Sequence, residues 1–168
     1  HRYGRRQRQM CIRDSYKTWS EKLNSDFKDY GLVGENLTID DFDEDKINIG
    51  DQFKINECLL QVSQPRIPCF KIGIKLNSRE FPKMFSQSGL LGSYLRVIHD
   101  GEISTGDVIH KVHSEENSMS IKDIAHLLFV DVKNIELMKQ ALDIKPLTEE
   151  IKEKFRERLM KLGDFSSL

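Results

Sequence analysis

The chain has 168 residues, of which 38% are hydrophobic and 32% are charged, and its formal net charge is −1. This composition is typical of a soluble globular protein, and the length fits one domain with a small appendage. No apolar run approaches the ~20 residues that a membrane-spanning helix needs, and the balanced charge disfavours a nucleic-acid-binding protein.

Residues 1–15 differ from the rest of the chain, since they contain five arginines and show no apolar periodicity. A basic arm for nucleic acid is one interpretation, and a leader foreign to the native protein is the other. Residues 7–15 resemble a translated sequencing adapter, so we interpret residues 1–15 as a non-native leader and exclude them from the fold. Without this leader, acidic residues outnumber basic ones, which further disfavours nucleic-acid binding.

The next part of the chain predicts one short helix and a polar loop. Residues 16–24 fit a helix in which Trp19 and Leu23 share one face, with Trp19 as a core anchor. The loop that follows contains Gly34, which permits close backbone approach, and then Glu35 and Asn36. These two polar side chains either line a ligand site or form an ordinary turn and cap, and the residues alone leave both options open.

The middle of the chain predicts short strands separated by turns. The expected strands are residues 52–55, 58–63, near 70–75, 93–99 and 108–112, with a short helix at 81–87. The histidines of this region are spread along the strands, which disfavours a metal site at His99, His110 and His113. Such a series of short strands is typical of a barrel or a sandwich.

Residues 61–71 lead from a strand into a stiff loop that carries one thiol, Cys69. Pro65 and Pro68 disfavour a regular helix or a central strand there. Arg66 and Lys71 flank the thiol, and nearby cations lower the pKa of a thiol and favour the thiolate that binds metals. A partly buried structural cysteine is the alternative. The three cysteines of the chain form no CxxC pair, so we expect no disulfide framework and a reducing, cytoplasmic setting.

Residues 118–165 predict three short helices. Ser120 can cap the first helix, and residues 133–142 repeat its apolar pattern. Pro146 then interrupts the chain, and the third helix carries apolar residues four apart, at Ile151, Phe155 and Leu159. Three such helices are too few to be stable alone, so we expect them to pack on the strands or on a second subunit. Basic and acidic residues are mixed here, which disfavours a DNA-reading helix–turn–helix.

Four short motifs, in matching order and spacing, resemble MOSC domains, which are named after the C-terminal domain of molybdenum cofactor sulfurase. They are Gly-Glu-Asn-Leu-Thr at 34–38, Ile-Gly-Asp-Gln-Phe at 49–53, Pro-Arg-Ile-Pro-Cys-Phe-Lys at 65–71 and Gly-Asp-Val-Ile at 106–109. The first of these is similar to a signature of the YiiM-type branch, and the resemblance runs from Tyr16 to the C-terminus. It implies an α+β, mainly β fold: a MOSC-type β-barrel at residues 16–114, without its first strands, and a three-helix segment at residues 118–165.

The resemblance also implies an enzyme that binds molybdenum cofactor, with the Cys69 thiolate as metal ligand. Further cofactor contacts are expected from Arg66, Lys71, Gln64, Glu35 and Asn36. The implied reaction is a two-electron reduction of small N-hydroxylated compounds, such as hydroxylaminopurines or amidoximes. The chain shows no iron–sulfur cysteine set and no dinucleotide-binding glycine loop, so a separate flavin-dependent reductase must supply the electrons.

Two alternatives stay open. Cys69 could hold a persulfide in a carrier of sulfur or of molybdenum cofactor, or the domain could be a non-catalytic cofactor-binding module. We expect no nucleic-acid or membrane partner and no pyridoxal phosphate, and a homodimer is one option for assembly.

Overall fold

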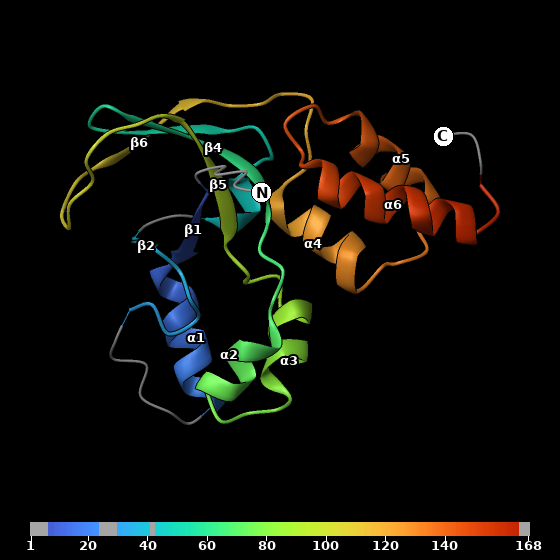
Figure 1. Ribbon diagram of the computed structural model, residues 1–168, viewed down its shortest axis with the longest axis horizontal. Coiled ribbons are helices and arrows are strands. Elements are labelled where there is room, and N and C mark those ends of the chain that lie inside the picture. The colour runs from blue at the N-terminus through green and yellow to red at the C-terminus, as the bar shows by residue number, and fades with distance from the viewer. Residues whose placement is uncertain (1–6, 24–29, 41–42, 165–168) are drawn as a thin grey trace, which may run out of the picture.

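The fold is built on one six-stranded sheet with two groups of helices next to it (Figure 1). The computed structural model describes residues 7–23, 30–40 and 43–164. The strands lie in the order β2-β1-β5-β4-β3-β6. Their bounds are Gln7–Ile12 (β1), Leu37–Ile39 (β2), Gln52–Ile55 (β3), Cys58–Pro65 (β4), Ser93–His99 (β5) and Ile109–His113 (β6). All neighbouring strands are antiparallel except β1 and β2, which are parallel.

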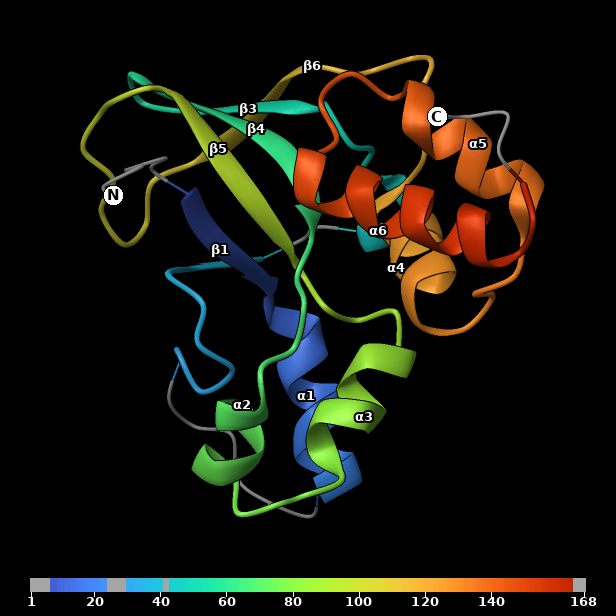
Figure 2. The same ribbon diagram turned by 45° about the vertical axis from the view of Figure 1, so that its right-hand side comes forward.

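Six α-helices are described, in two groups that lie on different sides of the sheet (Figure 2). The first group lies below the sheet and consists of α1 (Arg13–Leu23), α2 (Phe70–Lys75) and α3 (Phe81–Gln87). The second group lies beside the sheet and consists of α4 (Ile121–Phe129), α5 (Ile135–Asp143) and α6 (Glu149–Lys161). A short 3-10 helix, Glu44–Lys46, precedes β3. None of the described helices is long and apolar enough to cross a membrane.

The α+β class is confirmed, but the sheet is not a closed barrel and the chain is not mainly β. Among the described residues, more lie in helices than in strands. β2 and β6 form opposite edges of the described sheet, with no pairing between them. A barrel needs its edge strands to pair along a staggered register. Here β2 has only three residues and pairs with β1 alone, while β6 pairs with β3 alone.

The prediction that residues 1–15 stand outside the fold is wrong for residues 7–15. β1 pairs with β5 from Gln7 to Met10 and with β2 from Met10 to Ile12. Met10 is completely buried, and α1 follows β1 directly at Arg13. This strand is held in the sheet by backbone hydrogen bonds, which any side chain allows. Its polar composition therefore gave no sign of a strand. Residues 1–6 lie outside the described residues, and the adapter-like origin of the stretch stays a prediction.

The strand expected near residues 70–75 is wrong, because this segment is helix α2. Apolar residues alternate here, and in a strand Phe70, Ile72 and Ile74 would all lie on the same face. In the helix, Ile72 is buried while Phe70 and Ile74 are exposed. Gly73 allows α2 to lie close to the backbone at Ser78, because a Cβ at this position would lie 2.7 Å from the Ser78 carbonyl oxygen. The other predicted strands and the helices at 16–24 and 81–87 are confirmed to within three residues at their ends.

Two apolar clusters stabilise the two groups of helices. The first lies between the sheet and α4–α6 and includes Phe53, Leu60, Ile124 and Phe155. The second joins α1, α2 and α3 around Trp19, which is 1% exposed. The Trp19 ring meets Phe81 and Phe85 edge-on, at centroid distances of 5.0 and 5.4 Å. Trp19 is therefore the core anchor that its spacing predicted.

The three C-terminal helices form as predicted and pack on the sheet of the same chain. Ser120 makes a capping box with Asp123, in which the Ser120 Oγ accepts from the Asp123 amide and the Asp123 carboxylate accepts from the Ser120 amide. The apolar stripe of α6 is buried at Ile151, Phe155 and Leu159. These side chains belong to the same apolar cluster as strand residues such as Phe53 and Leu60, so contact with the sheet stabilises the three helices.

Candidate functional site

The loop that carries Cys69 is anchored at the end of β4. Pro65, the last residue of β4, pairs with Ser93 in β5, and the Arg66 amide donates to the Gly92 carbonyl at 3.1 Å. The chain then leaves the sheet as irregular loop, as its two prolines predicted, and Cys69 precedes the first turn of α2. The Cys69 thiol is exposed, whereas Cys58 is 3% exposed in the sheet. Of these two described cysteines, only Cys69 is open to an external ligand.

Arg66 is buried at the base of this loop, with one of its guanidinium donors unused. The residue is 5% exposed, its Nη2 donates to the Val33 carbonyl, and Nη1 has no hydrogen-bond partner. The guanidinium carbon lies 5.6 Å from the centroid of the Phe85 ring. A buried, unsatisfied donor on a charged group is unfavourable by about 1–3 kcal/mol or more. An oxyanion that reached Nη1 would remove this penalty.

The contact between Arg66 and Val33 brings the loop of Glu35 to the loop of Cys69. Glu35 is 8% exposed, and its Oε1 accepts from the Gly31 amide at 2.6 Å and from the Thr38 hydroxyl at 3.4 Å. Its Oε2 is buried without a partner. The Oε1 of Glu35 thus closes a turn, as the structural interpretation predicted. Its Oε2 has no partner and could accept from a ligand, which fits the interpretation as a ligand site. Asn36 is exposed on the same loop.

The other two predicted site residues point to different surroundings. Gln64 is 4% exposed, and its Oε1 accepts a hydrogen bond from the Thr148 hydroxyl at the start of α6. Lys71 is exposed on α2, two residues after Cys69. The structure therefore joins the loop of Glu35 to Arg66, at the start of the loop that carries Cys69, while Gln64 faces the C-terminal helices.

Ser93 is a buried polar residue that the sequence analysis missed. It is completely buried opposite Pro65 in the sheet, and its Oγ has no hydrogen-bond partner. Ser93 shares one face of β5 with Leu95 and Val97, and a serine at such a position is the signal that could have identified it. Thr148 was missed too, because its contact with Gln64 joins positions 84 residues apart.

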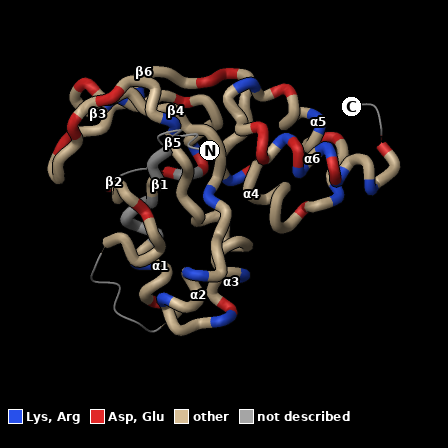
Figure 3. The backbone as a smooth tube through the Cα atoms, in the orientation of Figure 1, with Lys and Arg blue, Asp and Glu red and all other residues tan. Residues whose placement is uncertain are grey.

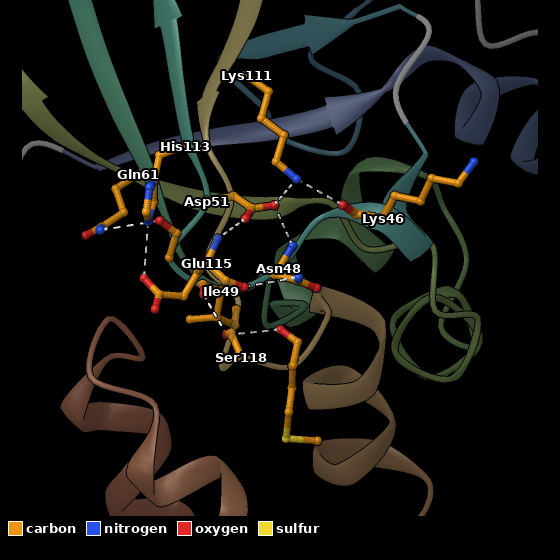
Figure 4. Close-up of polar contacts among 11 residues, drawn as sticks. Lys46, Asn48, Ile49, Asp51, Gln61, Lys111, His113, Glu115 and Ser118 are labelled. Atoms are coloured by element: carbon orange, nitrogen blue, oxygen red, sulfur yellow. Dashed lines mark hydrogen bonds and ion pairs between the residues drawn. The ribbon is translucent and has the colours of Figure 1, made fainter.

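A network of polar contacts surrounds Asp51 and joins separate segments of the chain (Figure 4). Asp51 is completely buried and accepts from Lys111 Nζ at 2.7 Å, the Asn48 amide at 2.8 Å and the Glu115 amide at 2.9 Å. These bonds join the turn before β3 to the segment between β6 and α4. The adjacent Gly50 has φ +101°, and a Cβ there would lie 2.8 Å from Pro146 Cγ. The motif at 49–53 thus connects the sheet to the C-terminal helices.

No metal-binding cluster of His, Cys, Asp or Glu occurs in the part of the chain that the structure describes. A small pocket of about 80 Å³ lies between α3 and α4, lined by Ser86, Gln87, Ser88, Gly89, Lys122, Ala125, His126 and Val130. None of the predicted site residues lines it. The loop at residues 66–69, which carries the exposed Cys69 thiol and the buried Arg66 donor, remains the candidate for a functional site.

Comparison with known proteins agrees with this architecture. The family model described as MOSC domain matches residues 2–110, and the one described as YiiM-like, 3-alpha helix domain matches residues 119–162. The crystal structure of YiiM from Geobacillus stearothermophilus is similar with a TM-score of 0.86 and 32% identity, covering 90% of this chain and 77% of that one.

Curated relatives extend the comparison. Protein YiiM of Escherichia coli is 27% identical over 98% of this chain and 75% of its own length. The uncharacterized protein YflK of Bacillus subtilis is 29% identical over 93% of this chain and 71% of its own length. A protein of Gibberella moniliformis named reductase is 28% identical over 87% of this chain, but the match spans only 26% of that longer protein.

Proposed function

The chain belongs to the MOSC domain family, in the branch with a YiiM-like three-helix domain, and on this premise we propose that it is a molybdenum-cofactor-dependent reductase of N-hydroxylated compounds. The family includes reductases, and a distant relative carries that name. The single observation that supports the proposal within this chain is one loop that carries both the exposed Cys69 thiol and the buried guanidinium of Arg66, whose Nη1 has no partner.

The residues present fit such a cofactor. Thiolate is a soft ligand that suits molybdenum better than carboxylate does, and Cys69 offers it at the surface. Arg66 Nη1 is a buried donor with no partner in the described chain, so it can donate a hydrogen bond to a phosphate or oxo group of the cofactor. Lys71 adds a flexible cation beside the thiol, and Asn36 adds a nearby amide. In this proposal Cys69 holds the metal and Arg66 orients the anionic part.

Glu35 and Gln64 take different parts in the proposal. The buried Glu35 Oε2 can accept a hydrogen bond from the pterin or from the substrate. The Oε1 of Gln64 is occupied by Thr148, so Gln64 acts by fixing the end of β4 to α6 rather than by offering that oxygen to the cofactor. Arg66 directly follows the last residue of β4, so the hydrogen bond between Thr148 and Gln64 helps to hold the start of the Cys69 loop in place.

The cofactor, when bound, would supply a two-electron reduction of the N–O bond, and the protein would supply binding and orientation. The balance is that the N-hydroxylated substrate, two electrons and two protons give the amine or amidine and water. No electron-carrying cysteine set or dinucleotide loop is found in the sequence, so the electrons would come from a separate flavin-dependent reductase.

The proposal is tested by comparing Cys69→Ser with the matched variant Cys58→Ser. Serine has nearly the shape of cysteine, but its alkoxide is far less available near neutral pH. We expect cofactor-loaded Cys69→Ser to lose reduction of hydroxylaminopurine or an amidoxime while keeping its fold. Cys58 lies in the sheet, so Cys58→Ser should keep most of the activity. Retained activity in Cys69→Ser would contradict the assignment of the metal ligand.

The exposure of Cys69 also favours a second candidate function, a carrier that holds sulfur as a persulfide. An exposed thiol can hold a persulfide and pass it to an acceptor. Mass spectrometry of the protein purified from a host that makes the cofactor separates the two candidates. Stoichiometric molybdenum supports the reductase, whereas a mass increase of one sulfur atom on Cys69 with no molybdenum supports the carrier.

A further inference from the structure

The surface beside Cys69 exposes two large apolar side chains. Phe70 is 68% exposed and Ile74 is 71% exposed, and they lie four residues apart on the same face of α2. Large apolar side chains that cluster at the surface mark an interaction site more often than isolated ones do. Phe70 directly follows Cys69, so this apolar pair begins at the proposed redox centre.

Four exposed cations lie within nine residues of this apolar pair in the sequence. Lys71, Lys75, Arg79 and Lys83 are all exposed, and Glu80 is the only acidic residue in residues 69–84. The Lys75 ammonium donates to the Gly31 carbonyl at 2.7 Å, but within the described chain none of these four cations forms an ion pair. Figure 3 shows several Lys and Arg positions along α2, α3 and the turn between them, at the end of the molecule away from α6.

Elsewhere in the described chain, some lysines pair with a carboxylate, while others, such as Lys54 and Lys133, are exposed and form no ion pair there. Lys46 pairs with Asp43, Lys122 with Asp45 and Lys154 with Glu150, at 2.8–2.9 Å. The formal charge of the whole chain is −1. A local excess of positive charge on a chain of this kind steers a negatively charged partner toward one place. We define the α2–α3 face as Phe70, Lys71, Ile74, Lys75, Arg79 and Lys83.

We propose that the α2–α3 face is the docking surface for an acidic electron-transfer protein, which delivers electrons to the centre at Cys69. The inference rests on the proposed function, because it requires a redox centre at Cys69. The partner's reduced flavin would give up two electrons and become oxidised, while two protons from solvent complete the reduction of the N–O bond to amine and water.

The composition of the α2–α3 face fits a transient complex of this kind. Electron-transfer complexes bury less than about 1,200 Å² and dissociate quickly, so a small patch suffices. An aromatic and an aliphatic anchor would supply the desolvated centre, and the cations would form the polar rim. A membrane surface fits less well, because α2 has only six residues and offers a short amphipathic face.

The test uses flavodoxin, a small acidic flavoprotein, as the electron donor, and dithionite as a donor that needs no docking. The variant is Arg79→Glu with Lys83→Glu, which leaves Cys69 and its predicted contacts intact. The matched control is Lys54→Glu with Lys133→Glu, since these lysines are exposed outside the α2–α3 face and the change in net charge is the same. Both variants and the parent chain are loaded with cofactor.

We expect the Arg79→Glu, Lys83→Glu variant to lose about tenfold in the rate with reduced flavodoxin at low salt. Its rate with dithionite should equal that of the parent, and the control variant should match the parent with both donors. Raising the salt from about 0.01 M to about 1 M shortens the Debye length from about 30 Å to about 3 Å, and it should slow the parent far more than the variant.

A binding measurement separates failure of this inference from failure of the proposed function. In NMR spectra of the ¹⁵N-labelled chain without cofactor, flavodoxin should shift the amides of residues 70–84. If dithionite drives no reaction in the parent, the proposed function fails, while these shifts would still report docking. Equal flavodoxin rates in both double variants, or no reaction with flavodoxin in a parent that dithionite reduces, would overturn the inference.

Two further outcomes would assign the α2–α3 face to another partner and so overturn the proposal. Binding to phosphatidylserine vesicles that Arg79→Glu, Lys83→Glu abolishes, without any effect of flavodoxin, would assign the face to a membrane. Concentration-dependent dimerisation that Ile74→Ser abolishes, again without any effect of flavodoxin, would assign it to a second copy of the chain.

Discussion

Replacing Asp51 by alanine should destabilise the protein more than its small size suggests. The carboxylate is completely buried and accepts from Lys111, from the Asn48 amide and from the Glu115 amide. Alanine leaves two backbone amides without their acceptor, at about 1–3 kcal/mol each. Lys111 is one third exposed and can turn to water, so the loss of its ion pair adds little. We therefore expect Asp51→Ala to lower the free energy of unfolding by about 3–5 kcal/mol.

Urea unfolding followed by circular dichroism measures this change, with Asp45→Ala as the matched control. Asp45 is also paired with a lysine, Lys122 at 2.8 Å, but its side chain is 58% exposed. Exposed ion pairs contribute about 0–1 kcal/mol, so Asp45→Ala should shift the midpoint little. Asp51→Asn should fall between the two, because its amide nitrogen cannot accept a hydrogen bond.

The reasoning would be refuted if Asp51→Ala lowered the free energy of unfolding by less than about 1 kcal/mol, with the slope of the urea dependence unchanged. That result would mean that water replaces the carboxylate at both amides. The turn at 49–53 would then not depend on Asp51, and its connection to the C-terminal helices would need another explanation.

Phe155 is fully buried, so Phe155→Asp should lower the free energy of unfolding by about 4 kcal/mol or more, and an unchanged melting temperature would contradict the packing of α6. Arg158 donates to the Leu127 and Leu128 carbonyls at 2.9 and 2.8 Å, so Arg158→Gln should cost about 1–2 kcal/mol in urea, whereas Arg156→Gln should cost little. The Arg156 hydrogen bond lowers the pKa of Glu149, so its small stabilisation is present above the unfolded pKa of about 4.5. The melting temperatures of Arg156→Gln and the parent should therefore converge as the pH falls below that value.

Local signals in the sequence predicted the elements that depend on neighbouring residues. Ser120 caps α4 as its position indicated, and the Ile151, Phe155 and Leu159 stripe faces the core. The hairpin of β3 and β4 has its turn at Asn56-Glu57, where Asn56 adopts a positive φ of 51°. Caps, stripes and tight turns are local, so the sequence is sufficient for them.

Features that depend on distant contacts could not be predicted. β1 is held by backbone bonds to β5, and these do not depend on the side chains that a composition analysis reads. α2 was mistaken for a strand because six residues are too few to distinguish the two periodicities. For the candidate site, the motif predicted Cys69 and Arg66, and their roles stay predictions, whereas the unused donor of the Arg66 guanidinium and the bond between Gln64 and Thr148 needed the structure.

The most direct test of the central claim is X-ray absorption at the molybdenum edge of the cofactor-loaded chain. If Cys69 is the metal ligand, the spectrum of Cys69→Ser should show one fewer sulfur neighbour than the parent, while Cys58→Ser should be unchanged. An identical sulfur shell in Cys69→Ser and the parent would contradict the assignment, and Cys69 would revert to an exposed cysteine without a role at the metal.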